Sequence, residues 1–90
     1  MSLAKIASFT EEVLKDVSEQ RRYAEEGNNI KGFFAARDRI NQRFGEMRRT
    51  LASPPNQEAY LGLVNAMERL YSILLIQFTN AYFRGPGGQR

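Results

Sequence analysis

The sequence has 90 residues, of which 42% are hydrophobic and 26% are charged, and its formal net charge is +3. This composition is typical of one small globular domain and excludes a disordered chain. Cysteine and histidine are both absent. Disulfides, thiolate metal sites and the commonest general base are therefore excluded. We expect a single helical domain over residues 1–84 and a flexible Gly/Pro tail over residues 85–90.

The first predicted helix covers about residues 3–26. Its apolar positions recur every three or four residues, which is the period of one helix face; they include Leu3, Ile6, Val13 and Val17. Ser8 and Glu11 fit a capping box that would start the helix near residue 9, whereas inclusion of the first apolar turn starts it near residue 3. Gly27 occupies the usual place of a left-handed C-terminal cap.

The second predicted helix covers about residues 29–52, with Asn28 or Asn29 as its N-cap. One stripe follows a heptad-like pattern through Ile30, Phe33, Arg37, Ile40, Phe44, Met47 and Leu51. Arg37 interrupts it, and a charge there is costly unless it is paired. We expect its stem to pack and its head to reach solvent or a carboxylate of the first helix; the alternative is a partner anchor. Pro54 and Pro55 end this helix.

The third predicted helix covers about residues 57–83 and has two apolar faces. One seam suits the internal core: Tyr60, Val64, Met67, Tyr71, Leu74, Phe78 and Ala81. The second set contains Leu63, Leu70, Ile73, Ile76 or Gln77, and Phe83, and Leu61 and Leu75 add to it. The candidate partner interface within these positions is Leu61, Ile73, Leu75, Ile76 and Phe83. If this helix is the central element, the other two helices cover both faces. If they do not, the second set is exposed and marks a partner interface, which is the interpretation we favour.

These elements predict an all-α fold, an antiparallel up-down-up bundle of three long helices. The short connections favour antiparallel neighbours. Dimerisation could complete a larger bundle, because small folds often gain core by association.

Charge is distributed unevenly along the chain. Residues 1–27 hold six acidic and four basic side chains, whereas residues 28–55 hold two acidic and six basic ones. We expect an acidic first helix to pack beside a basic second helix. The alternative is a phosphate-binding basic patch, and therefore nucleic-acid binding, through Arg37, Arg39, Arg43, Arg48 and Arg49. Glu46 would lie inside that patch, so we rank nucleic-acid binding second.

Catalysis and membrane insertion find little support. Glu12, Asp16 and Glu19 share a helix face, but a di-metal bundle also needs a Glu-x-x-His pattern. We therefore expect no enzymatic activity, no metal and no cofactor.

The N-terminal residues lack the apolar run of a secretory signal, and the apolar run at residues 70–83 is shorter than a spanning helix. These features predict a soluble, cytoplasmic protein without a transmembrane segment.

Two segments resemble a known family. Residues 36–41, Ala-Arg-Asp-Arg-Ile-Asn, followed by Met47-Arg48-Arg49, resemble the second helix of the small lumenal photosystem II assembly proteins. Met67, Leu74 and Phe78, placed before Arg84, resemble that family's third helix. The similarity covers about half of the chain. The family's fourth helix and the lipoprotein cysteine of its cyanobacterial members have no counterpart here. The resemblance implies a non-catalytic accessory factor that docks on a membrane complex.

The sequence as a whole predicts a non-enzymatic protein–protein interaction module, such as an accessory, adaptor or assembly factor. The expected partner is another protein, most simply a second copy of the chain in a homodimer.

Overall fold

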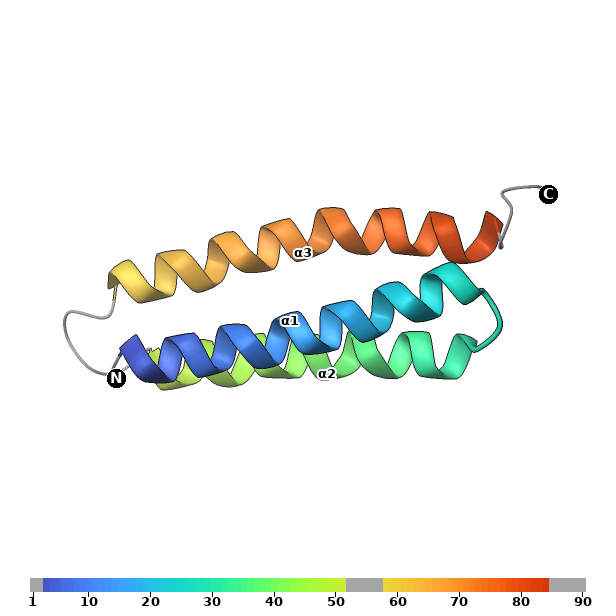
Figure 1. Ribbon diagram of the computed structural model, residues 1–90. Coiled ribbons are helices and arrows are strands. Elements are labelled where there is room, and N and C mark those ends of the chain that lie inside the picture. The colour runs from blue at the N-terminus through green and yellow to red at the C-terminus, as the bar shows by residue number, and fades with distance from the viewer. Residues whose placement is uncertain (1–2, 52–57, 85–90) are drawn as a thin grey trace.

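A computed structural model describes residues 3–51 and 58–84 of the chain, and three helices make up nearly all of these ranges. They are α1 (Leu3–Glu26), α2 (Ile30–Leu51) and α3 (Glu58–Arg84). The described residues are 96% helical and contain no strand. The helices run up, down and up along a rod of 51 × 17 × 16 Å (Figure 1). The prediction of an all-α three-helix bundle is confirmed.

The turn between α1 and α2 is built by the two predicted caps. Gly27 has a φ of 67°, which glycine adopts without steric cost, and its amide donates to the Tyr23 carbonyl at 2.9 Å. At the start of α2, the Asn29 side-chain oxygen accepts a hydrogen bond from the Gly32 amide at 2.9 Å. This contact identifies Asn29 as the N-cap.

The helix ends lie within one residue of the predicted ends. The start of α1 at Leu3 decides between the two starts that the sequence allowed: the helix runs through Ser8, so a capping-box start near residue 9 is wrong. The proline break at residues 53–56 and the tail at residues 85–90 lie outside the described residues.

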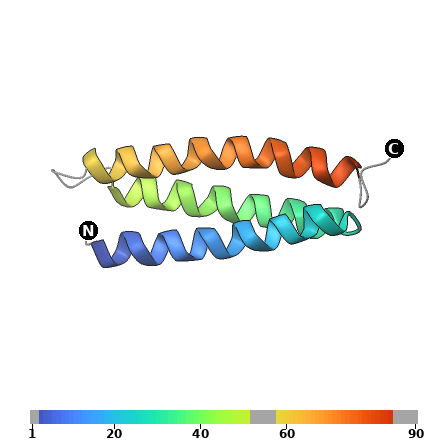
Figure 2. The same cartoon turned by 45° about the horizontal axis from the view of Figure 1, so that its top comes forward.

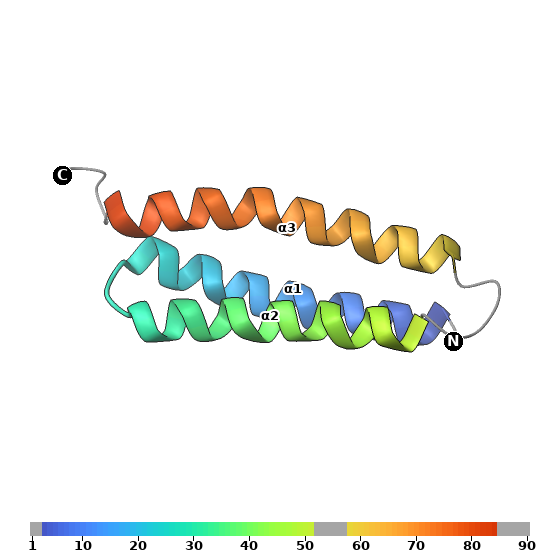
Figure 3. The same ribbon diagram turned by 180° about the vertical axis from the view of Figure 1, so that it is seen from behind.

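The core consists of two apolar clusters along the rod. The first joins all three helices near the start of α1 and contains Ile6, Phe9, Val13, Ile40, Phe44, Leu51, Val64 and Tyr71. The second lies near the end of α1 and contains Ala24, Phe33 and Tyr82. The views in Figures 2 and 3 show that α3 follows the α1–α2 pair along its length. Each cluster can therefore draw on all three helices.

The apolar stripe of α2 passes through Ala36 rather than Arg37. Ala36 is fully buried, whereas Arg37 is half-buried at the edge of the bundle. The predicted seam position of Arg37 is therefore wrong. The small Ala36 side chain fills the core position, and the guanidinium avoids the cost of burying a charge.

The core stripe of α3 also departs from the predicted seam in its C-terminal half. Tyr82 is buried and Ala81 is exposed, while Leu75 packs against both clusters. Val64 and Tyr82 are eighteen residues apart, which is five turns of an α-helix, so they share one face. A strict heptad repeat drifts away from that face by about 20° per heptad. The predicted seam alternated steps of three and four residues, which is a heptad repeat, so its later positions moved away from the buried face of α3.

Candidate functional site

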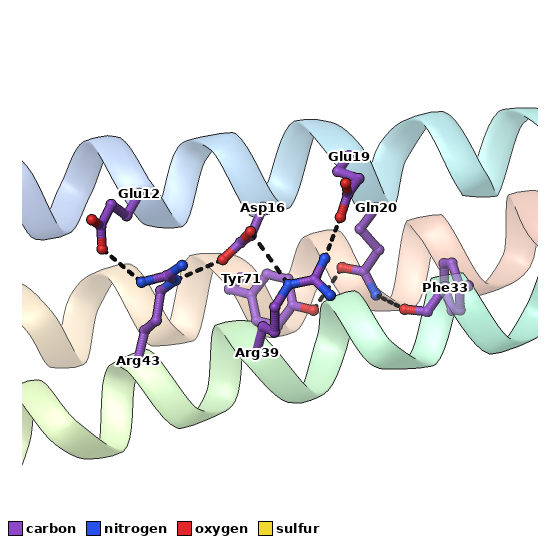
Figure 4. A network of polar contacts seen from close by, with 8 residues as sticks. All are labelled: Glu12, Asp16, Glu19, Gln20, Phe33, Arg39, Arg43 and Tyr71. Atoms are coloured by element: carbon purple, nitrogen blue, oxygen red, sulfur yellow. Dashed lines mark hydrogen bonds and ion pairs between the residues drawn. The ribbon is translucent and has the colours of Figure 1, made fainter.

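Two arginines of α2 are held by carboxylates of α1. Arg43 donates from Nε to Asp16 at 2.6 Å and from Nη1 to Glu12 at 2.6 Å (Figure 4). Arg39 pairs with Glu19 and also lies 3.5 Å from Asp16. The predicted pairing of an acidic α1 with a basic α2 is confirmed by these contacts.

The Asp16 carboxylate is the centre of this network. Its side chain is largely buried, whereas both arginines are partly exposed. The hydrogen bond to Asp16 raises the pKa of the Arg43 guanidinium above its ordinary value. A carboxylate engaged by two guanidinium groups has little capacity left to act as a general base. Within residues 3–51 and 58–84, no group of acidic side chains is arranged to hold a metal ion.

The remaining arginines of the candidate basic patch are divided between separate contacts. Arg37 pairs with Asp38 at 3.0 Å, and its guanidinium lies 4.7 Å from the centre of the Phe34 ring. Arg48 pairs with Glu68 of α3. Together with the pairs of Arg39 and Arg43, these contacts engage four of the five predicted arginines with carboxylates. From the sequence we expected the Arg37 head to reach solvent or a carboxylate of α1, whereas its carboxylate partner, Asp38, belongs to α2 itself.

A buried polar contact links the three helices between the two apolar clusters. Gln20 is fully buried; its Oε1 accepts from the Tyr71 hydroxyl at 2.6 Å and its Nε2 donates to the Phe33 carbonyl at 3.3 Å (Figure 4). Burial raises the pKa of Tyr71 to about 12. Sequence reasoning missed Gln20. Its position three and seven residues after Val17 and Val13, on the apolar face of α1, was the available signal.

Most of the large apolar side chains that are exposed in the described residues lie on α3. Five large side chains of this helix are about half or more exposed, and we call them the outward face of α3: Leu63 (48%), Leu70 (62%), Ile73 (56%), Ile76 (63%) and Phe83 (58%). Large apolar side chains gathered in this way mark interaction surfaces more often than singly scattered ones do.

The structure divides the five predicted interface residues. Ile73, Ile76 and Phe83 belong to the outward face, whereas Leu61 and Leu75 are partly buried and pack against the core. The latter two are corrected to core positions, because their side of α3 faces the other helices. Leu63 and Leu70 were recognised as part of the second apolar set but were not placed in the predicted interface.

An apolar groove adjoins the outward face between α1 and α3. Its volume is about 160 Å³, and it is lined by Val13, Leu14, Val17, Phe44, Met67, Leu70, Tyr71 and Leu74. Leu70 belongs to both the groove and the outward face. Leu14 is 59% exposed at the groove, and sequence reasoning missed it because it lies off the main apolar stripe of α1. We call this feature the α1–α3 groove.

By length and composition, α3 also satisfies the requirements of a membrane-crossing helix, and it does so alone among the described helices. The sequence prediction had excluded a spanning segment from the shorter run at residues 70–83. In the bundle, α3 supplies Val64, Tyr71 and Tyr82 to the core. A core helix of a soluble bundle can pass the same test.

Comparisons with known proteins give no relative from which a function could be transferred. No protein-family model matches the chain, and no curated protein or solved structure shows a significant match. The functional argument therefore depends on the residues themselves.

Proposed function

We propose that this protein is a non-enzymatic interaction module that associates with a second copy of itself through the outward face of α3. The single observation that carries the proposal is the exposure of five large apolar side chains on one helix. Burying a side chain of this size contributes about 1.5–3 kcal/mol. Five such groups on each chain offer enough apolar surface to offset the cost of association.

Nucleic-acid binding receives less support than self-association. A nucleic-acid surface needs basic side chains that are available to phosphates. Arg39 and Arg43 are engaged by α1 carboxylates, and Arg48 is engaged by Glu68. A phosphate would have to compete with carboxylates that are already held in place by the fold.

Membrane insertion of α3 also receives less support. If α3 left the bundle for a bilayer, the Tyr71 hydroxyl would lose Gln20 and Glu68 would lose Arg48. The uncharged run at residues 70–83 would extend for only about 21 Å as a helix, whereas a hydrocarbon core is about 30 Å thick. A protein surface can bury the outward face without breaking these contacts.

Sedimentation velocity between about 1 and 100 μM tests the proposal. The wild-type chain should show a concentration-dependent dimer. The double variant Ile73→Glu, Ile76→Glu should sediment as a monomer and retain its helical circular dichroism, because both side chains lie outside the core. A wild-type chain that remains monomeric over this range would contradict the proposal.

A matched control places the same two charges on another helix. Asn41 and Gln42 are exposed on α2, and the double variant Asn41→Glu, Gln42→Glu should dimerise like the wild type. If this control also becomes monomeric, the effect of the α3 variant is due to net charge and the outward face is not the interface.

A further inference from the structure

The outward face of α3 is symmetric about one residue. Leu70 and Ile76 lie three residues on either side of Ile73, and Leu63 and Phe83 lie ten residues on either side of it. A two-fold interface requires that residue i of one chain meets residue j of the other and that j meets i. On two antiparallel copies of one helix, residues equally distant from the centre come together, and the outward face has this arrangement.

We infer that two copies pair antiparallel across a two-fold axis at Ile73, so that Leu70 meets Ile76 of the copy and Leu63 meets Phe83 of the copy. The inference depends on the proposed self-association and specifies its partner surface. Ile73 of each chain would then contact Ile73 of the other. Each large side chain of the outward face would have an apolar counterpart.

Charges on α3 favour the antiparallel pairing over a parallel one. Arg69 lies four residues before Ile73, so its antiparallel counterpart is Gln77, whose side-chain oxygen can accept a hydrogen bond. Arg84 lies eleven residues after Ile73, so its counterpart is Gly62. A parallel pair would instead place each arginine beside itself, and like charges at an interface are unfavourable.

The outward face also runs obliquely across α3. Three residues are slightly less than one turn and ten residues are about 2.8 turns. Successive members of the set therefore shift steadily from one flank of the helix to the other. Leu70 is on the flank next to α1, because it lines the α1–α3 groove. Ile76 and Phe83 fall on the opposite flank.

An oblique stripe makes the two α3 helices cross at an angle. The C-terminal half of each α3 then passes over the α1–α3 groove of the other chain, with Ile76 of the copy beside Leu70. Leu14 borders this groove and is 59% exposed. The crossing would bury it, although nothing in its own bundle does so.

Single-cysteine variants test the arrangement directly, because the chain has no cysteine of its own. Ile73→Cys should form a disulfide with itself on mild oxidation, since side chains at a two-fold axis face one another. An equimolar mixture of Leu70→Cys and Ile76→Cys should give severalfold more crosslinked dimer than either variant alone. Asn41→Cys, an exposed position on α2, should give only the background of random collisions.

Leu14→Glu tests the crossing over the groove. The variant should keep its helical content and weaken the dimer by at least about tenfold, because the charge would be buried against the copy. Lys15→Glu, which changes the neighbouring exposed residue, should weaken it much less. Unchanged association of Leu14→Glu would overturn the crossing over α1.

The outcomes separate this inference from the proposed function. A wild-type dimer in which Leu63→Cys or Phe83→Cys crosslinks with itself as readily as Ile73→Cys does, as a parallel pair requires, would overturn the antiparallel arrangement and leave self-association intact. A wild-type chain that stays monomeric would overturn both the antiparallel arrangement and the proposed self-association. Binding of that monomer to vesicles of mixed neutral and anionic phospholipid would then identify a membrane surface as the partner of the outward face.

Discussion

The Tyr71 hydroxyl donates a hydrogen bond of 2.6 Å to the Gln20 side-chain oxygen inside the bundle. Fifty-one residues separate the two along the chain, and their contact lies between the two apolar clusters of the core. A buried polar group costs free energy unless it is paired. Sliding α3 along α1 would separate Tyr71 from Gln20 and leave both polar groups buried without this partner. The contact therefore favours one register of α3 against α1.

Removal of the tyrosine hydroxyl should destabilise the fold. Tyr71→Phe leaves the Gln20 oxygen without that partner in a buried site, and we expect the free energy of unfolding to fall by about 1–2 kcal/mol in urea denaturation. The double variant Gln20→Leu, Tyr71→Phe removes both polar partners and should recover part of the loss. Equal stability of Tyr71→Phe and the wild type would show that the hydrogen bond contributes nothing.

The same tyrosine should make the fold sensitive to alkali. Burial raises the pKa of Tyr71 from its ordinary value of 10 to about 12. Below pH 10 the hydroxyl is protonated in both the folded and the unfolded chain, and its contribution is complete. Between pH 10 and about 12 the unfolded chain releases the proton and the folded chain retains it, so the free energy of unfolding falls as the pH rises.

Urea denaturation at a series of pH values from 9 to 12 measures this dependence. Tyr71→Phe is the control, because it lacks the titrating group and should show a shallower decline over the same range. Parallel pH profiles for the two chains would contradict the assignment to Tyr71.

Neutralising Asp16 should weaken the α1–α2 pairing more than breaking an exposed ion pair does. Asp16 is largely buried and engages Arg43 and Arg39. Hydrogen bonds to charged groups contribute about 1.5–3 kcal/mol, so we expect Asp16→Asn to lower the free energy of unfolding by about 1–2 kcal/mol. Glu25→Gln, which breaks an exposed pair with Arg21, should cost less than about 0.5 kcal/mol. Equal effects in chemical denaturation would show that burial of Asp16 is unimportant.

Two glycines should respond to alanine in opposite ways. Gly27 has a φ of 67°, a region that alanine avoids, so Gly27→Ala should destabilise the fold by about 1 kcal/mol. At Gly45, within α2, an added Cβ would meet only the Arg49 side chain, at 3.6 Å. Gly45→Ala should therefore raise stability by up to about 1 kcal/mol, because alanine favours the helix. Thermal unfolding by circular dichroism measures both, and a loss of stability at Gly45 would contradict the packing around it.

Oligonucleotide binding should be weak and sensitive to salt. Arg39 and Arg43 are engaged by carboxylates, so fluorescence anisotropy with labelled single-stranded or duplex DNA should detect little binding at about 150 mM salt. Tight binding at that salt concentration, abolished by Arg39→Glu with Arg43→Glu, would reverse the ranking of functions.

The sequence by itself determined the three helices and, apart from the start of α1, their approximate ends. Helical spacing of apolar residues predicted three elements, and Gly27 with Asn28 or Asn29 identified the turn between α1 and α2, because caps depend on backbone geometry within a few residues. Uneven charge also predicted that α1 carboxylates would face α2 arginines. These are local features or sums over a whole helix, and they do not require knowledge of which side chains meet.

Only the tertiary structure decided which apolar side chains are buried. Leu75 and Ile76 are adjacent and both have large aliphatic side chains, yet Leu75 packs against the core and Ile76 is exposed. The predicted seam followed a 3.5-residue repeat, whereas α3 continues at 3.6 residues per turn. The difference between the predicted and the buried face therefore grew along the helix, and near its end Ala81 was predicted to be buried where Tyr82 is. The partner of Gln20 was equally hidden, because a contact across fifty-one residues depends on how two helices are aligned and not on either segment alone.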